Sequence, residues 1–151
     1  MIRAVIVEDE PLARRTLRDF LGEIDWVELA GEAENGSDGV RLVGEIRPQL
    51  VFLDVQMPGL SGLELLERIP YEPAIVFTTA HDEYAVRAFE VEAIDYVMKP
   101  FDRKRFAEAL RRAKNQMSEP EADAEARILR LLERMLEKKP LDHFVVKQVA
   151  A

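Results

Sequence analysis

Short apolar runs rich in β-branched residues alternate along this chain with longer segments in which apolar residues recur every three or four positions. The short runs fit strands buried on both faces of a sheet, and the longer segments fit helices with one apolar face. Five such pairs occupy about 116 residues, so the sequence predicts an α/β fold with a parallel sheet covered by helices on both faces. The predicted strands are 4–7, 26–33, 50–53, 74–77 and 93–98, and the predicted helices are 12–24, 40–46, 63–69, 84–90 and 106–113.

Three residues that favour helix ends stand beside the first two predicted helices. Pro11 is suited to the first turn of a helix, because the N–H groups of that turn have no acceptor within the helix. Asn35 is a typical N-cap residue, and Pro48 is expected to stop the second helix.

The composition excludes several classes of protein. The chain has 151 residues, a formal charge of −8 and no cysteine. The charge argues against nucleic-acid binding by the chain as a whole, because phosphate contacts need Lys and Arg. The lack of cysteine excludes disulfides, thiolate zinc sites and cysteine nucleophiles. No run approaches the ~20 apolar residues of a membrane helix, and 4–7 is too short for a signal peptide, so we expect a cytoplasmic protein with no membrane partner.

Polar side chains stand where four of the predicted strands end. The first strand is followed by Glu8 and Asp9, the third by Asp54, the fourth by Thr79 and the fifth by Lys99. Because parallel sheets place ligands at the carboxyl ends of their strands, we expect these side chains to share one crevice. Three carboxylates so close would repel one another, and oxygen ligands without Cys or His suit a hard cation, Mg²⁺ above all.

This set of groups is suited to phosphoryl transfer. A carboxylate beside a metal and an amine can attack phosphorus, with Lys99 offsetting charge on the phosphoryl oxygens and Thr79 donating a hydrogen bond. Each residue alone has an ordinary structural explanation, such as a helix cap or a solvated surface group. The combination, in this order on these strands, favours the functional interpretation.

The chain resembles the (CheY-like) receiver domain of bacterial two-component response regulators. The matching motifs are VEDEP at 7–11, LDVQMPGLSG at 53–62, TTA at 78–80 and DYVMKPF at 95–101. The segment from Phe77 to Asp102 is more narrowly similar to receivers joined to LytTR-type DNA-binding domains. The resemblance implies a doubly wound, flavodoxin-like α/β fold: a five-stranded parallel sheet in the order 2-1-3-4-5, with five helices.

The resemblance also implies a role for each acid. Asp54 is the phosphoacceptor. Asp9 and Asp54 hold Mg²⁺, Glu8 assists through water, and the backbone carbonyl of Gln56 supplies a further oxygen to the metal.

Other roles implied by the resemblance concern the phosphoryl group and the switch. Lys99 pairs with the phosphoryl group, Thr79 binds one of its oxygens, and Tyr96 is the aromatic residue that reorients with Thr79. The peptide bond between Lys99 and Pro100 is expected to be cis, whereas Thr78 is expected to be structural.

A sensor histidine kinase or a small phosphodonor is the implied source of the phosphoryl group. Phosphorylation would then remodel the face formed by the fourth helix, fifth strand and fifth helix, and so control homodimerisation. The protein would be a switch and not a metabolic enzyme. We further hypothesise that Gln56 and His81 tune the lifetime of the phosphoryl group, because they flank the place where water must attack. The alternative for His81 is an ordinary surface loop residue.

Three other classes of protein fit the sequence less well. Phosphatases of the haloacid dehalogenase type need a second Asp two residues after the nucleophile, where this chain has Gln56. Dinucleotide-binding proteins need a GxGxxG motif, which Gly59 and Gly62 do not form. A receiver that is no longer phosphorylated disagrees with the presence of the acids, Thr79 and Lys99.

The predicted domains are a receiver at 1–116, a linker with an amphipathic helix at 117–140, and the start of a LytTR-type domain at 141–151. The linker helix has an apolar stripe that would either form a coiled coil with a second chain or pack on its own receiver. A whole effector domain would need on the order of 100 further residues, so we expect a truncated chain whose intact parent contacts DNA only through the missing domain.

Overall fold

The computed structural model describes residues 1–80, 93–117 and 132. Outside them lie His81, the predicted helix at 84–90 and, apart from Leu132, the predicted linker and effector segments beyond Met117.

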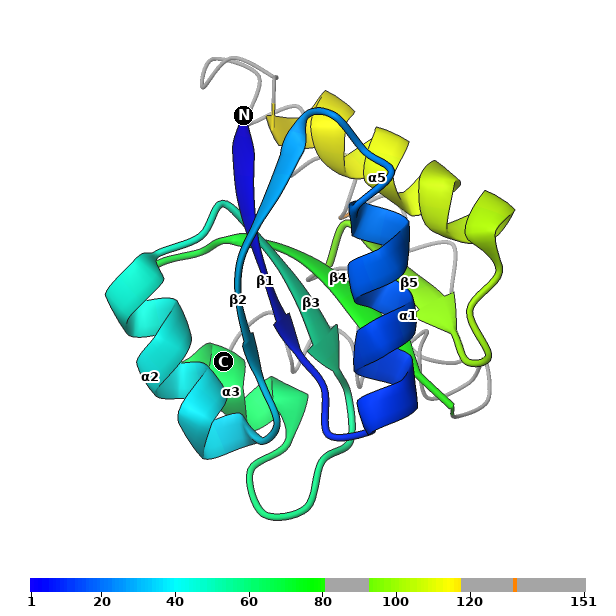
Figure 1. The fold of residues 1–151 in the computed structure, drawn as a ribbon. Helices are drawn as coiled ribbons and strands as arrows, with labels where there is room; N and C mark the ends of the chain where they lie inside the picture. The colour runs from blue at the N-terminus through cyan, green and yellow to red at the C-terminus, as the bar shows by residue number, and fades with distance from the viewer. Residues whose placement is uncertain (81–92, 118–131, 133–151) are drawn as a thin grey trace.

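The described strands form one parallel sheet in the order β2-β1-β3-β4-β5, which confirms the predicted fold class and strand order (Figure 1). Each strand coincides largely with one of the predicted apolar runs. Their bounds are Ile2–Val7 for β1, Val27–Ala33 for β2, Leu50–Asp54 for β3, Ala74–Thr79 for β4 and Asp95–Met98 for β5.

The described residues include four helices, and three predicted end signals are confirmed. Pro11 lies in the first turn of α1. The side chain of Asn35 caps α2 by accepting a hydrogen bond of 2.8 Å from the Asp38 N–H. The second helix stops before Pro48, as expected, with Arg47 in the left-handed conformation (φ 52°). The helices are α1 Pro11–Leu21, α2 Gly36–Ile46, α3 Gly62–Arg68 and α5 Arg103–Met117.

Some strand ends differ from the prediction by one or two residues. β5 begins two residues late, because its regular pairing with β4 starts with Asp95 opposite Val76. Ile94 donates its N–H to a β4 carbonyl before that ladder begins. β3 and β4 extend through Asp54 and Thr79, since a polar side chain does not prevent its backbone from pairing.

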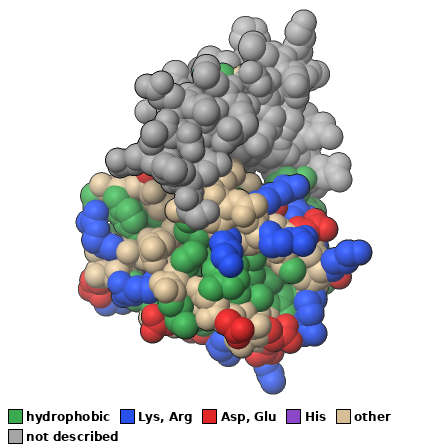
Figure 2. All heavy atoms as spheres, turned by 90° about the horizontal axis from the view of Figure 1, so that it is seen from above, with side chains coloured by type: hydrophobic (Ala, Val, Ile, Leu, Met, Phe, Trp, Pro, Cys, Tyr) green, Lys and Arg blue, Asp and Glu red, His purple; other side chains and the backbone are tan. Residues whose placement is uncertain are grey.

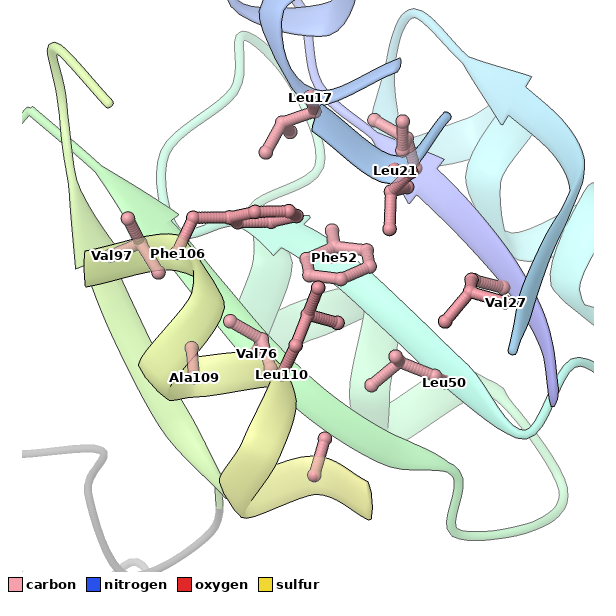
Figure 3. Close-up of a cluster of buried hydrophobic side chains, with 13 residues drawn as sticks. Leu17, Leu21, Val27, Leu50, Phe52, Val76, Val97, Phe106, Ala109 and Leu110 are labelled. Atoms are coloured by element: carbon pink, nitrogen blue, oxygen red, sulfur yellow. The ribbon is translucent and has the colours of Figure 1, made fainter. Parts of the chain in front are cut away.

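The sheet has a separate apolar cluster on each face, because alternate residues of a strand point to opposite sides. On one face, α1 and α5 cover the cluster drawn in Figure 3, in which the Phe52 and Phe106 rings have centroids 5.4 Å apart. On the other face, α2 and α3 supply Val43 and Leu65 to a second cluster. The sheet is therefore the middle layer of three, as Figure 1 shows.

The end of the molecule from which β1 starts is shown in Figure 2. Among the described residues on this face, basic and acidic side chains are interspersed around hydrophobic ones. None of the described helices is long and apolar enough to cross a lipid bilayer.

Candidate functional site

The carboxyl ends of β1, β3, β4 and β5 bring the predicted site residues together. Parallel pairing sets Val7 opposite Leu53, so Glu8 and Asp54 continue their strands side by side. One carboxylate oxygen from each of Glu8, Asp9 and Asp54 lies within 4.8 Å of the others, a spacing that could hold a metal ion. The three acids named from the sequence therefore lie together as one acidic cluster.

The loop after β3 is held close beneath Asp54. Gly62 donates its N–H to the Val55 carbonyl (3.1 Å), and a Cβ at Gly62 would collide with the Asp54 carbonyl oxygen. Ser61 and Glu64 form a reciprocal capping box at the start of α3. Only glycine permits this close approach, which fixes the backbone of Asp54 against the first turn of α3.

Asp54 is a buried carboxylate with a defined partner for each oxygen. Its Oδ1 accepts a hydrogen bond of 3.1 Å from the Gln56 N–H, and its Oδ2 lies 3.2 Å from Lys99 Nζ. Burial, together with Glu8 and Asp9, raises the pKa of Asp54 to about 8, although the charge of Lys99 acts in the opposite direction. Without a cation, the cluster therefore favours a proton on Asp54.

Glu8 is completely buried, and both of its carboxylate oxygens accept hydrogen bonds. One of its oxygens accepts a hydrogen bond from Thr78 Oγ1 (3.2 Å), and the other accepts from Lys99 Nζ (2.9 Å) and the Glu10 N–H (3.2 Å). Thr78 has the structural role expected of it, because its hydroxyl fixes the Glu8 carboxylate. These contacts hold Glu8 in place within the acidic cluster.

Lys99 reaches three carboxylates from the end of β5. Its Nζ lies 2.6 Å from Glu10, 2.9 Å from Glu8 and 3.2 Å from Asp54. Burial lowers the pKa of Lys99, but hydrogen bonds to Glu10 and Glu8 and the charges of Glu8 and Asp54 more than compensate, so the pKa is raised and the amine stays charged. The peptide bond from Lys99 to Pro100 is cis, as expected.

The two predicted switch residues occupy neighbouring strands. Thr79 is buried at the end of β4, and its carbonyl accepts a hydrogen bond of 2.8 Å from the Lys99 N–H. Tyr96 is half-buried in β5 opposite Phe77. The backbone thus ties Thr79 directly to Lys99, the residue that follows the strand carrying Tyr96.

An ionic cluster that the sequence did not predict surrounds Tyr96. The buried Asp95 carboxylate accepts two hydrogen bonds from Arg105 of α5, at 2.9 and 2.7 Å, and lies 3.2 Å from Arg112. Arg105 also donates to the Tyr96 carbonyl (2.7 Å), and its guanidinium lies 5.5 Å from the centre of the Tyr96 ring. No motif or spacing indicates this contact, because Arg105 meets Asp95 across the turn from strand to helix.

Glu10 is a second site residue whose role sequence reasoning missed. Residues 8–10 are three consecutive acids, but the sequence pattern assigns roles only to Glu8 and Asp9.

Gln56 is exposed and lies beside Asp54, to which it donates its N–H. The metal-binding and lifetime roles expected of Gln56 stay predictions. His81 lies outside the described residues.

Comparisons with known proteins agree with this geometry. Residues 4–111 match the family model of the response regulator receiver domain. The transcriptional regulatory protein BtsR of Escherichia coli K12 is 48% identical over 120 residues, which are 78% of this chain and 50% of BtsR. A response regulatory protein of Vibrio cholerae is 42% identical over 118 residues, 77% of this chain and 50% of that protein. The chain thus spans about half the length of these curated relatives.

Solved structures of receivers are also similar. The receiver domain of AraT, a response regulator from Geobacillus stearothermophilus, has a TM-score of 0.66 and 30% identity, covering 77% of this chain and 95% of that one. The response regulatory domain of mrkE from Klebsiella pneumoniae has a TM-score of 0.67 and 33% identity, covering 76% of this chain and 97% of that one.

Proposed function

The chain belongs to the response regulator receiver domain family, and from this premise we propose that it is the switch of a two-component system, with Asp54 as the residue that accepts a phosphoryl group. The observation that carries the proposal is the position of Asp54. Its carboxylate lies beside the acids Glu8 and Asp9 and 3.2 Å from the ammonium of Lys99. A nucleophile beside a candidate cation site and a fixed positive charge is what phosphoryl transfer needs.

The transfer step uses an ionised oxygen of Asp54 as nucleophile. A bond forms between this oxygen and phosphorus while the bond from phosphorus to the donor breaks. The electron pair leaves with the donor, which is acetate from acetyl phosphate, or a histidine imidazole of a sensor kinase that then takes up a proton from water. Lys99, 3.2 Å from Asp54 Oδ2, is placed to offset charge on the phosphoryl oxygens.

Mg²⁺ is the cation that best fits the acidic cluster. Glu8, Asp9 and Asp54 offer only carboxylate oxygens, which are ligands for a hard cation. We propose that Asp9 and Asp54 hold the ion directly, together with the backbone carbonyl of Gln56, and that Glu8 assists through water. When bound, Mg²⁺ supplies positive charge that relieves repulsion between the carboxylates and attracts the phosphoryl oxygens.

The switch proposed here is Thr79 together with Tyr96. Thr79 would donate its hydroxyl to a phosphoryl oxygen, and Tyr96 would reorient behind it. Arg105 of α5 contacts both the carbonyl and the ring of Tyr96. Movement of Tyr96 would therefore displace Arg105 and change the position of α5. The surface around β5 and α5 would then shift between two populations and control homodimerisation.

The remaining partners are part of the same proposal. A sensor histidine kinase in the cytoplasm would donate the phosphoryl group, and the predicted linker helix would contribute to the dimer. Because BtsR is named a transcriptional regulatory protein, we propose that the intact protein contacts DNA. The similarity of the segment from Phe77 to Asp102 to receivers joined to LytTR-type domains supports an effector domain of that type. Gln56 and His81 are proposed to tune the lifetime of the phosphoryl group. The protein would act as a switch and not as a metabolic enzyme.

Removal of Mg²⁺ tests the transfer step. With acetyl phosphate and Mg²⁺ we expect one phosphoryl group per chain, located on Asp54 by mass spectrometry of the intact protein and its peptides. Chelation with EDTA should abolish incorporation, since Lys99 alone would then offset the negative charge of the three carboxylates and of the incoming phosphoryl group, and excess Mg²⁺ should restore it. Incorporation that is insensitive to EDTA, or located on another residue, would contradict the proposal.

The oligomeric state tests whether phosphorylation of Asp54 controls homodimerisation. In sedimentation with Mg²⁺, we expect beryllofluoride, which mimics a phosphoryl group on Asp54, to increase the molar mass from monomer towards dimer. A dimer that is already complete without beryllofluoride would indicate constitutive association through the linker helix. An unchanged monomer would contradict phosphorylation-dependent dimerisation.

A further inference from the structure

Glu10 stands at the junction of the β1–α1 loop and α1 but does not cap the helix. It occupies the N-cap position of α1, and its side chain makes no capping hydrogen bond. Glutamate is not among the preferred N-cap residues, which have shorter side chains that reach the first N–H groups. Its carboxylate instead lies 2.6 Å from Lys99 Nζ, the shortest of the three distances from that nitrogen to a carboxylate.

The three carboxylates around Lys99 differ in their freedom to leave. Glu8 is completely buried and held by Thr78, and Asp54 is buried and held by the Gln56 N–H. The side chain of Glu10 is 56% exposed. Release of Glu10 from Lys99 therefore costs little, because water can solvate its carboxylate at once, whereas release of Glu8 would leave a buried charge.

A phosphoryl group on Asp54 would need the same ammonium that Glu10 occupies. Lys99 has three N–H donors, and three carboxylates already surround it. Phosphorylation turns the Asp54 carboxylate into an acyl phosphate, so one phosphoryl oxygen can take the place of Asp54 at Lys99. A second phosphoryl oxygen can be accommodated only if another carboxylate gives up its hydrogen bond to Lys99. Glu10 also carries a negative charge close to the place of an incoming anionic group, which adds repulsion to competition.

We propose that Glu10 is a displaceable counter-ion of Lys99, and that its departure sets how readily the site accepts a phosphoryl group. The inference rests on the proposed function, because it concerns the same transfer to Asp54. Glu10 is a positioning residue, acting through Lys99. In the unphosphorylated protein it holds the ammonium, and in the phosphorylated protein the phosphoryl oxygens replace it.

Glu34 provides a matched control for the charge of Glu10. It is also an exposed acid beyond the carboxyl end of a strand, here β2, and its side chain is 77% exposed. It pairs with Arg14 at 3.7 Å and has no contact with Lys99 among the described residues. Glu10→Gln and Glu34→Gln therefore remove the same charge, but only the first removes a partner of Lys99.

The first experiment measures binding of beryllofluoride in the presence of Mg²⁺ by ¹⁹F NMR. Glu10→Gln should bind beryllofluoride about twofold to fivefold more tightly than wild type, the range expected for loss of a half-exposed ion pair. Glu34→Gln should bind like wild type. Calorimetric titration with Mg²⁺ alone should show similar affinities for the two variants, because neither Glu10 nor Glu34 belongs to the acidic cluster.

The second experiment examines Lys99 in the metal-free protein. The exchange of its ammonium hydrogens with water, followed by ¹⁵N-edited NMR, should be severalfold faster in Glu10→Gln than in wild type, because one hydrogen-bonded partner has gone. Glu34→Gln should again match wild type. This readout does not involve any phosphoryl group.

The outcomes separate this inference from the proposed function. If wild type binds beryllofluoride but Glu10→Gln binds it no more tightly than Glu34→Gln, the inference fails and the proposed function stands. Unchanged ammonium exchange in Glu10→Gln would also overturn the inference. If wild type binds no beryllofluoride and accepts no phosphoryl group, the proposed function fails and the inference fails with it.

Discussion

Asp54→Asn is expected to abolish phosphorylation by acetyl phosphate. The amide that replaces the carboxylate is a poor nucleophile and offers one oxygen fewer to a cation, so both the transfer and the metal site lose an essential group. Incorporation is measured by intact-protein mass spectrometry over a time course that saturates wild type. Normal incorporation in this variant would remove Asp54 as the acceptor.

The folded state of this variant provides the control. Asparagine is close to aspartate in size, and the change removes a buried carboxyl group whose ionisation is opposed by burial and by Glu8 and Asp9. In Mg²⁺-free buffer its thermal unfolding midpoint should therefore be at or above that of wild type. Loss of phosphorylation in a fully folded Asp54→Asn variant would then reflect lost chemistry and not unfolding.

Phe106→Ala is expected to lower the free energy of unfolding by about 3–5 kcal/mol, the usual cost of emptying a buried phenylalanine site. The Phe106 ring is buried beside Phe52, as Figure 3 shows. Its centroid lies 5.4 Å from that of Phe52 and 5.4 Å from that of Phe20. It therefore joins α5 to both α1 and the middle of the sheet. The change should also loosen the attachment of α5, the helix that carries Arg105.

Urea unfolding with linear extrapolation measures this effect. Leu12→Ala is the matched control, because Leu12 is an apolar residue of α1 that is 74% exposed. It should change the free energy of unfolding by less than about 0.5 kcal/mol, as surface substitutions usually do. A loss for Phe106→Ala no larger than that for Leu12→Ala would contradict the packing described for α5.

Much of the candidate site was predictable because strand ends are local features of a sequence. A buried run followed by an acid marks the end of a strand, and a parallel sheet gathers such ends at one edge. Asp54 and Glu8 were placed correctly for this reason, and Lys99 was placed at the same edge. The order of the strands followed from the resemblance to receivers and not from the apolar pattern.

Other features of the fold and the site depend on contacts that no local sequence pattern indicates. The β5 ladder begins at Asp95 because pairing with Val76 decides it, whereas the apolar run suggested an earlier start. The contacts of Arg105 with Asp95 and Tyr96 depend on how α5 lies against β5. Both features arise when separate elements pack, so the residues alone did not indicate them.

The layered fold and the set of groups at the site can be predicted from the residues, because the spacing of apolar residues and the residues after each strand are properties of short segments. The pairing of those groups depends on how distant segments pack together. Lys99 meets Glu8 and Glu10 across 91 and 89 residues of chain, and Asp54 across 45. Which carboxylate is buried and which is exposed depends on the surrounding elements. That difference makes Glu8 a fixed partner of Lys99 and Glu10 the one that we propose to be displaced.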